Sequence, residues 1–270
     1  MRRRLALALG ALALSAGPTL AAAAAAPPAT VTPGTLTVAL NMPSDGFQVG
    51  AVKGREVVAA RGFEVDLADA LAAKLGLGGV TFVQEPRFTA LLASGPKPWD
   101  LALAQVSATD ARRTAVDFSV PYLAADQGVL FSLQTLARPT TIADLKGVKL
   151  CAQKGTTGAD LIATTIRPTV PALLPTTTTV LTRGLTNGRC QAVVFDAPGL
   201  ATLRAQVPTR YGPFAGVIRT GESYGAVFQK GNRLRGPVNR ALAALRKDGT
   251  ITTLKKRWLT SDPATLPVLK

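Results

Sequence analysis

The fold class follows from the stretch GFEVDLADALAAKLG, which runs from Gly62 to Gly76. Its Leu67, Leu71 and Leu75 recur every four residues, which is the spacing of one face of an α-helix, and Gly76 stands where such a helix ends. Acidic residues lie in the first turns, where the helix dipole favours negative charge. The stretch therefore predicts an amphipathic helix that packs on a core.

Strand-like segments surround this helix. Residues 35–40 and 80–83 have the composition and alternation of strands, residues 88–93 read as a short helix, and residues 101–106 read as a further strand. Strands that alternate with helices predict βαβ units and a parallel sheet.

The same pattern starts again at Ile142 and predicts a second α/β lobe. We expect strands at 148–153, 179–181 and 191–195, a turn at 154–158, and helices from Ala159 and at 199–205. The tail predicts two helices, at 234–245 and 251–258.

The N-terminus has the three-part layout of a secretory signal. MRRR is followed by an apolar run at residues 5–14 and by small residues through Ala26. We expect residues 1–26 to be a cleaved signal peptide and 27–34 to be a Pro-rich linker. A retained membrane anchor is the alternative, but the run is shorter than the roughly 20 residues that a spanning helix needs. No Cys follows to carry a lipid, so a periplasmic or secreted protein is expected.

The composition argues against several classes of function. The formal net charge is +15, but the basic residues are scattered and no aromatic residues are interleaved to stack on bases, which argues against a nucleic-acid partner. The chain has no His, so the commonest general base and the usual zinc ligand are missing. We therefore expect no catalytic residues, no cofactor and no metal.

Polar residues at the end of the strand at 101–106 are candidates for ligand binding. In open α/β sheets, ligands lie beyond the carboxyl ends of the strands, where Gln105 and Ser107 are placed. Arg112 follows five residues after Ser107 and can offer a planar fork to a carboxylate. The alternative is that Arg112 pairs with Asp110 on a solvated face.

Four motifs in order resemble those of family 3 extracellular solute-binding proteins. They are the helix opening at 62–67, the S-x-T-x-x-R segment at 107–112 with DFSVPY at 117–122, the GTT turn at 155–157, and the ending at 248–258. The resemblance implies a two-lobed, type II periplasmic binding protein fold in which each lobe is a mostly parallel sheet flanked by helices. It also implies a two-segment hinge between lobe I (35–124 and 222–270) and lobe II (125–221).

The chain is further similar to general L-amino acid-binding proteins, at RFTAL (87–91) and at 188–196. The resemblance implies a monomer that captures a polar amino acid, acidic or of broad range, for the membrane permease of an ABC transporter. Arg112 would then hold the ligand α-carboxylate, with donors from Ser107, Thr156 and Thr157. The backbone carbonyl of Gln105 and the carboxylate of Asp196 would hold the α-ammonium, whereas the alternative for Asp196 is a helix N-cap before Pro198.

The pocket for the ligand side chain departs from the common family pattern. Ser44 and Arg87 stand where many members carry an aromatic and an apolar residue. Arg87 favours a polar or acidic ligand side chain, or else faces the surface. Asn41 and Asp45 lie in the same first loop and are weaker candidates.

Cys151 and Cys190 are the only cysteines, and an even count in an exported chain favours a disulfide over two buried thiols. The resembling amino acid binders carry cysteines at corresponding places. Two rival functions stay open at this stage: an enzyme similar to cyclohexadienyl dehydratases on the same scaffold, and a ligand-sensing partner of a membrane receptor.

Overall fold

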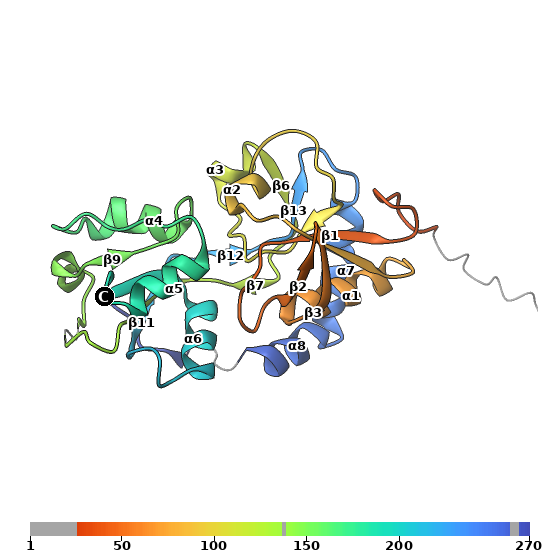
Figure 1. Cartoon of the computed structure of the whole chain (residues 1–270). Coiled ribbons are helices and arrows are strands. Elements are labelled where there is room, and N and C mark those ends of the chain that lie inside the picture. The colour runs from red at the N-terminus through yellow and green to blue at the C-terminus, as the bar shows by residue number, and fades with distance from the viewer. Residues whose placement is uncertain (1–25, 137–138, 260–264) are drawn as a thin grey trace, which may run out of the picture.

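The computed structural model describes residues 26–136, 139–259 and 265–270. These residues form two α/β lobes that lie side by side and are joined by extended segments (Figure 1). The expected signal peptide, residues 1–26, lies outside the described residues except for Ala26. No helix in the described ranges is both long and apolar enough to cross a membrane.

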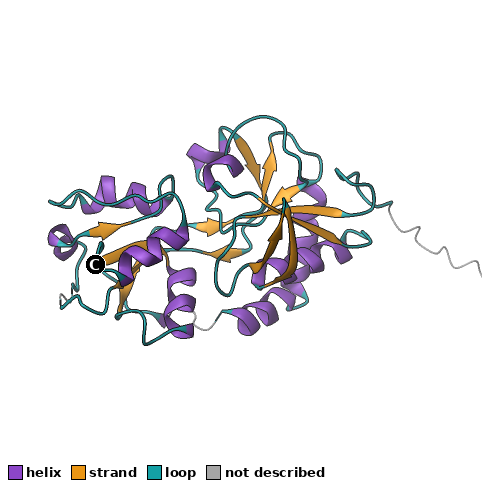
Figure 2. Ribbon diagram, in the orientation of Figure 1, coloured by secondary structure: helices purple, strands orange, loops and turns teal. Residues whose placement is uncertain are grey.

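The first lobe contains a seven-stranded sheet covered by helices (Figure 2). In sheet order its strands are β2 (Val49–Lys53), β3 (Glu56–Arg61), β4 (Val80–Gln84), β1 (Leu36–Leu40), β5 (Leu101–Ala102), β13 (Val227–Gln229) and β6 (Val116–Phe118). Its helices are α1 (Phe63–Lys74), α2 (Phe88–Leu91), α3 (Asp110–Arg113), α7 (Arg235–Lys247) and α8 (Thr250–Trp258).

Helix α1 confirms the predicted amphipathic helix. Phe63, Leu67 and Leu71 are fully buried in the core of this lobe, against residues of β1, α7 and α8. Gly62 precedes the helix with φ 133°, and a Cβ at this position would come within 2.2 Å of the carbonyl oxygen of Phe47. Only glycine fits there, because the backbone conformation and the close approach both exclude a side chain.

The second lobe contains a four-stranded sheet with the order β11 (Phe214–Ile218), β8 (Gln127–Phe131), β10 (Ala192–Asp196) and β9 (Leu150–Cys151). Its helical segments are the 3₁₀ helix at Ala143–Gly147, α4 (Thr157–Leu161), which continues as a π-helix at Ile162–Ile166, α5 (Thr178–Thr186) and α6 (Ala197–Gln206). A separate buried cluster, which includes Phe131, Leu150 and Val194, forms the core of this lobe.

The strand directions correct the expectation of mostly parallel sheets. Among the named strands, β1 pairs in parallel with β4 and β5, and β10 with β9, whereas all other pairs within the two sheets are antiparallel. Two features account for the antiparallel pairs. β2 and β3 form a hairpin that the sequence pattern did not predict, and β8 and β13 run antiparallel to neighbouring strands. The fold remains mixed α/β with two lobes.

The strand expected at 179–181 is also wrong. These residues lie inside α5, where the side chain of Thr177 accepts a hydrogen bond from the backbone N–H of Val180 at 3.3 Å. A threonine-rich run favours a strand by propensity, but an N-cap and the packing of Leu181 on the core decide for a helix.

Two short strands join the lobes. β7 (Leu123–Ala124) pairs antiparallel with β12 (Ser223–Tyr224) and forms a sheet separate from the other two. The last residues also reach the second lobe: Val217 donates to Pro267 O at 2.7 Å, and Leu269 is buried in that core. This tail departs from the assignment of all of 222–270 to lobe I, because Leu269 buries its apolar side chain on β11.

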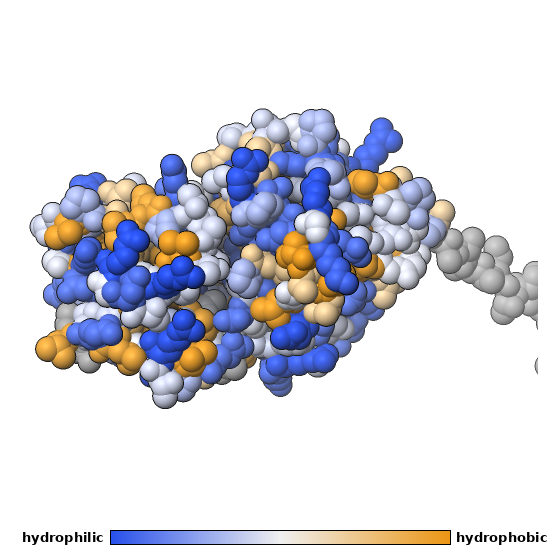
Figure 3. Space-filling view, viewed as in Figure 1, coloured by the Kyte–Doolittle hydropathy of each residue, from blue (hydrophilic) through white to orange (hydrophobic). Residues whose placement is uncertain are grey.

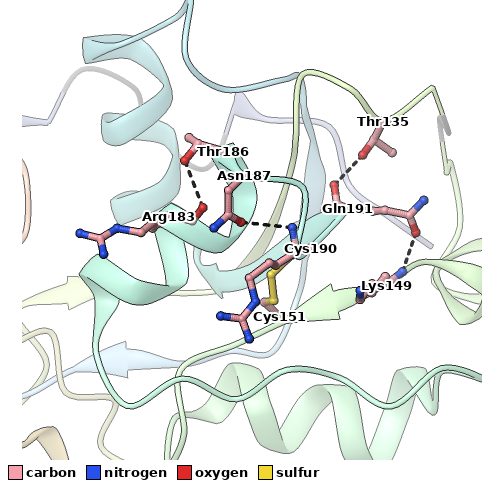
Figure 4. Close-up of a disulfide and its surroundings, with 9 residues drawn as sticks. Thr135, Lys149, Cys151, Arg183, Thr186, Asn187, Cys190 and Gln191 are labelled. Carbon is pink, nitrogen blue, oxygen red and sulfur yellow. Dashed lines mark hydrogen bonds between the residues drawn. A yellow bond between two sulfur atoms is a disulfide. The ribbon is translucent and has the colours of Figure 1, made fainter.

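The predicted disulfide between Cys151 and Cys190 is present, with 5.8 Å between the Cα atoms (Figure 4). It lies between β9 and the start of β10, which pair in parallel with Cys151 opposite Val193. Helix α5 packs onto it at Gly184, where a Cβ would meet Cys190 Sγ at 2.9 Å. The bond therefore ties together the two strands that lead to the 155–157 turn and to Asp196.

Candidate ligand-binding site

Polar residues from both lobes meet in a small inner cavity of about 20 Å³. Eight of the nine ligand-binding residues predicted from the sequence line it, and the exception is Arg87. Its walls are Asn41, Ser44, Phe88, Ala104, Gln105, Ser107, Arg112, Gln153, Thr156, Thr157, Thr178, Phe195 and Asp196. That free volume is about the room of one water. A solute as large as an amino acid can therefore enter only if the lobes move apart.

Arg112 reaches across the boundary between the lobes. Its Nη1 donates to the carbonyl oxygen of Ser107 at 2.9 Å, and its Nη2 donates to that of Gly155, in the other lobe, at 3.2 Å. Its guanidinium lies 5.4 Å from the centre of the Phe88 ring. Asp110 pairs instead with Arg113, at 4.0 Å, so the alternative of an Arg112–Asp110 pair is not what the structure contains.

Burial lowers the pKa of Arg112, while the nearby carboxylates of Asp196 and Glu222 act in the opposite direction. The side chain is aimed by α3, in which the hydroxyl of Thr109 accepts a hydrogen bond from the backbone N–H of Arg112. A fixed, partly desolvated fork of N–H donors is suited to a carboxylate.

Asp196 faces the same cavity from the end of β10 and is 5% exposed. Its carboxylate accepts hydrogen bonds from Gln127 Nε2 at 2.5 Å and from the hydroxyl of Tyr224 at 2.8 Å. Although Asp196 occupies the N-cap position of α6, its side chain makes no capping bond. Burial raises the pKa of Asp196 to about 7, against the lowering effect of the Tyr224 hydroxyl.

Gln105 has a backbone conformation that is rare for residues other than glycine, with φ 52°. Its N–H donates to Glu64 Oε1 at 2.8 Å, and its Nε2 donates to Ser44 Oγ at 2.6 Å. Two residues later in the same loop, the buried Ser107 bridges to Tyr224 of the connecting strand β12. The loop after β5 is thus hydrogen-bonded to the buried Glu64 and paired with the connecting strand β12.

Glu64 is a functional candidate that the sequence reasoning missed. It is fully buried and accepts hydrogen bonds from Gln105 N–H, from Gln48 Nε2 at 2.8 Å and from the hydroxyl of Tyr122. Burial raises its pKa to about 7, and these donors lower it. An acid between Phe63 and Val65, in the buried opening of a helix, is the signal that could have revealed it.

Two tyrosines in the hinge contact the buried acids of the two lobes, Glu64 and Asp196. The hydroxyl of Tyr122 bonds Glu64 in the first lobe, the hydroxyl of Tyr224 bonds Asp196 in the second, and the two ring centres are 6.0 Å apart. Burial raises the pKa of each tyrosine well above the ordinary value. Both phenols therefore act as neutral donors that orient the carboxylates.

The hydroxyls of the 155–157 turn are already engaged within the protein. Thr156 Oγ1 donates to Gln153 O at 2.7 Å and accepts from Ala159 N, which makes Thr156 the N-cap of α4. Thr157 Oγ1 accepts from Gln127 Nε2 at 3.1 Å. The donors that this turn can offer a ligand are therefore the hydroxyl of Thr157, which keeps its own hydrogen, and the first N–H groups of the helix.

The candidates for the side-chain pocket divide between two places. Asn41 and Ser44 line the cavity, and Asn41 Nδ2 also donates to Glu85 O at 2.6 Å. Arg87, the N-cap residue of α2, is exposed and does not line the cavity, whereas the next residue, Phe88, does. Asp45 lies in an adjoining, larger cavity.

The described residues contain no group of three or more His, Cys, Asp or Glu side chains placed to hold a metal ion. On the face drawn in Figure 3, hydrophilic residues are spread over both lobes and do not gather in one patch. Between the lobes, Arg112 and Asp196 line the same cavity.

Known proteins are similar to this chain in sequence. The L-cystine-binding protein TcyJ of Escherichia coli (strain K12) is 29% identical over 236 residues, which cover 85% of this chain and 84% of that protein. The ABC transporter glutamine-binding protein GlnH of Bacillus subtilis (strain 168) is 27% identical over 213 residues, which cover 75% of this chain and 74% of that protein.

A solved structure of an ancestral arginine-binding protein bound to glutamine superposes with a TM-score of 0.73 at 29% identity, covering 85% of this chain and all of that one. The two lobes and their hinge are those of a type II periplasmic binding protein. Residues 38–261 match the family described as bacterial extracellular solute-binding proteins, family 3. The chain therefore belongs to the bacterial extracellular solute-binding proteins of family 3.

Proposed function

We propose that this protein is the substrate-binding component of an ABC importer and that it captures a polar amino acid between its lobes. One observation carries the proposal: Arg112 from the first lobe and Asp196 from the second line the same cavity. These groups match the carboxylate and ammonium of an α-amino acid. The relatives described above, which bind cystine or glutamine, support this class of ligand.

The carboxylate end of the ligand is the part that Arg112 would hold. Its two terminal nitrogens now donate to carbonyl oxygens of Ser107 and Gly155, and a carboxylate between them would accept the same donors with a full negative charge. The first N–H groups of α4 add donors from the second lobe. Each charge-assisted bond contributes roughly 1.5 to 3 kcal/mol.

The ammonium end needs an acceptor that carries charge. Asp196 supplies a carboxylate already oriented by Gln127 and Tyr224, and the Gln105 carbonyl would supply a neutral acceptor. A bound ammonium stabilises the ionised form of Asp196, so binding would lower a pKa that burial holds at about 7. Contacts at both ends together suffice for micromolar affinity, which corresponds to about −8 kcal/mol.

Capture at both ends would also close the protein. Arg112 and Asp196 belong to different lobes, so a ligand that binds both favours the state in which the lobes approach each other. The closed form, a monomer in the periplasm or outside the cell after loss of residues 1–26, would deliver the solute to a membrane permease.

The amino acid's side chain is less constrained by these contacts. The case for an acidic ligand side chain relied on Arg87, which is exposed and away from the inner cavity. The proposed ligand is therefore a polar amino acid, and Arg87 gives no reason to prefer an acidic one.

An enzyme of the cyclohexadienyl dehydratase type is the rival on this scaffold. Such chemistry needs a positioned general acid. In the inner cavity, Asp196 is the carboxyl that could act as one, and the proposal assigns it to the ammonium. Incubation with prephenate separates the two: the proposal expects no phenylpyruvate.

The direct experiment is a calorimetric titration of the mature protein, first unfolded and refolded to remove carried ligand, against the twenty common amino acids and L-cystine. The proposal expects at least one of them to bind with micromolar or tighter affinity. Absence of binding by every one of them would refute the proposed function.

A further inference from the structure

The buried carboxylate of Glu64 joins two loops of the first lobe that both line the inner cavity. Its Oε1 accepts a hydrogen bond from the backbone N–H of Gln105 at 2.8 Å, and its Oε2 accepts one from Gln48 Nε2 at 2.8 Å. Gln48 Oε1 in turn accepts a hydrogen bond from the backbone N–H of Asn41 at 2.9 Å. One carboxylate therefore connects the loop after β5 to the first loop, at residues 41–48.

The direction of these hydrogen bonds requires two acceptors at position 64. A backbone N–H can only donate, so the oxygen of Gln48 faces Asn41 and its NH₂ group faces Glu64. The backbone N–H of Gln105 needs the other oxygen. Glu64→Gln would keep one acceptor and turn an NH₂ group toward that of Gln48, so the contact with one of the two loops would be lost.

This arrangement opposes folding on its own. Glu64 is fully buried, and within the described residues it forms no salt bridge. Its remaining donor, the hydroxyl of Tyr122, is neutral. A buried carboxylate without a cation is costly, and an apolar side chain would pack beside Phe63 and Val65 without that cost. Departures of this kind from the packing rules are expected where a chain builds a functional site.

The residue that Glu64 holds has two unused acceptors. Gln105 lines the inner cavity with φ 52°, a conformation that costs energy for any residue other than glycine. Its Nε2 donates to Ser44, but its Oε1 is buried without a hydrogen-bond partner in the described part of the chain, where its carbonyl oxygen also accepts no backbone hydrogen bond. Buried acceptors without donors are costly, which favours a ligand group that only donates. An ammonium has three N–H donors and no acceptor.

We propose that Glu64 is a positioning residue for the ammonium end of the site, because it fixes Gln105 in the conformation that presents these acceptors. This inference rests on the proposed function, which gives the ligand ammonium to Gln105 and Asp196. Glu64 acts through the main chain of Gln105 and, by way of Gln48, through the first loop. The ammonium contacts should then depend on Glu64, whereas the carboxylate contacts of Arg112, which α3 aims, should not.

The test compares three probes made from the amino acid that binds the parent most tightly: that amino acid, the amine that lacks its carboxylate, and its N-acetyl derivative. For L-glutamine the two analogues are γ-aminobutyramide and N-acetyl-L-glutamine. Affinities are measured by calorimetry on refolded mature protein, with competition for the weaker probes. Glu64→Gln should weaken the amino acid and the amine at least tenfold each, but the N-acetyl derivative less than threefold. A general loss of structure would weaken all three alike.

Asp66→Asn is the matched control, because it removes a carboxylate from the same turn of α1. The Asp66 carboxylate accepts hydrogen bonds from Arg257 and Trp258, away from the cavity, so all three affinities should stay within threefold of the parent.

A double variant, Glu64→Gln with Gln48→Glu, exchanges the two side chains and keeps an acceptor for the N–H groups of Gln105 and Asn41. It should bring the affinity for the amino acid back to within fivefold of the parent. It also tests the inference if Glu64→Gln alone does not fold.

The inference is overturned if Glu64→Gln weakens the three probes equally or weakens none of them. It is also overturned if the folded double variant has lost the preference for the amino acid over its N-acetyl derivative. Failure of the proposed function gives a different result, because the parent itself would then bind no amino acid.

Discussion

Replacing Arg112 by alanine isolates the carboxylate end of the proposed site. The side chain offers two N–H donors, now 2.9 Å from Ser107 O and 3.2 Å from Gly155 O, and both would turn to the ligand carboxylate. Two charge-assisted bonds at roughly 1.5 to 3 kcal/mol each give about 3 to 6 kcal/mol. Since the unliganded protein also gives up two carbonyl contacts, we expect the lower end of that range, or roughly a hundredfold rise in Kd.

The assay is calorimetric titration with the amino acid that binds best to the parent protein. Arg113→Ala is the control, because it removes the same charge one residue away, where the guanidinium packs on Phe118 and pairs weakly with Asp110. Arg112→Lys should recover only part of the affinity, since lysine lacks the planar fork. The reasoning is refuted if Arg112→Ala binds within threefold of the parent while its thermal unfolding is unchanged.

Four further predictions concern Asp196, the disulfide and the hinge. Burial raises the pKa of Asp196 to about 7, and the ligand ammonium needs the ionised carboxylate, so Kd should rise about tenfold from pH 8 to pH 6. Asp196→Asn should bind weakly, and its Kd should not depend on pH. If this variant kept the tenfold pH dependence of the parent, another group would be its cause. The same raised pKa means that the folded protein holds an extra proton between about pH 4 and 7, so the stability of the unliganded protein should fall as pH rises through that window in denaturant titrations. Reduction of the Cys151–Cys190 bond, which closes a separation of 39 residues, should destabilise the protein by up to about 4 kcal/mol, and two free thiols in unreduced, denatured protein from an oxidising compartment would contradict the bond. Small-angle scattering should show compaction on ligand addition, and an unchanged radius of gyration would contradict closure about β7 and β12.

Much of the fold could be predicted because local patterns agree with the packing. Leu67 and Leu71 repeat at helical spacing, and both are fully buried in α1. The hairpin of β2 and β3 was missed because its residues are mostly exposed and do not alternate cleanly between apolar and polar. Strand direction was missed for a different reason: it depends on where the chain re-enters each lobe from the hinge, which no local pattern encodes.

In the candidate site, residues close together in the sequence could be predicted, whereas contacts between distant residues could not. Gln105, Ser107 and Arg112 lie on one short segment, so their proximity follows from a strand end and the turn after it. The buried partners come from distant parts of the chain: Glu64 meets Tyr122 across 58 positions, and Asp196 meets Tyr224 across 28. Such pairs need tertiary structure to bring them together.

Arg87 shows the limit of reasoning by position. The family pattern placed it in the ligand pocket, with a surface-facing arginine as the alternative. The side chain is exposed, and the one that lines the cavity is that of Phe88. A shift of one residue at a helix N-terminus turns a side chain toward or away from a site.

The central claim is that one ligand is held by its carboxylate in the first lobe and by its ammonium in the second. The most direct measurement is calorimetry of refolded protein with the best-binding amino acid, with the amine that lacks its carboxylate, and with its N-acetyl derivative. The account predicts that each analogue binds at least a hundredfold more weakly than the parent amino acid, because each loses one of the two charged contacts. An analogue that binds as tightly as the parent would contradict it.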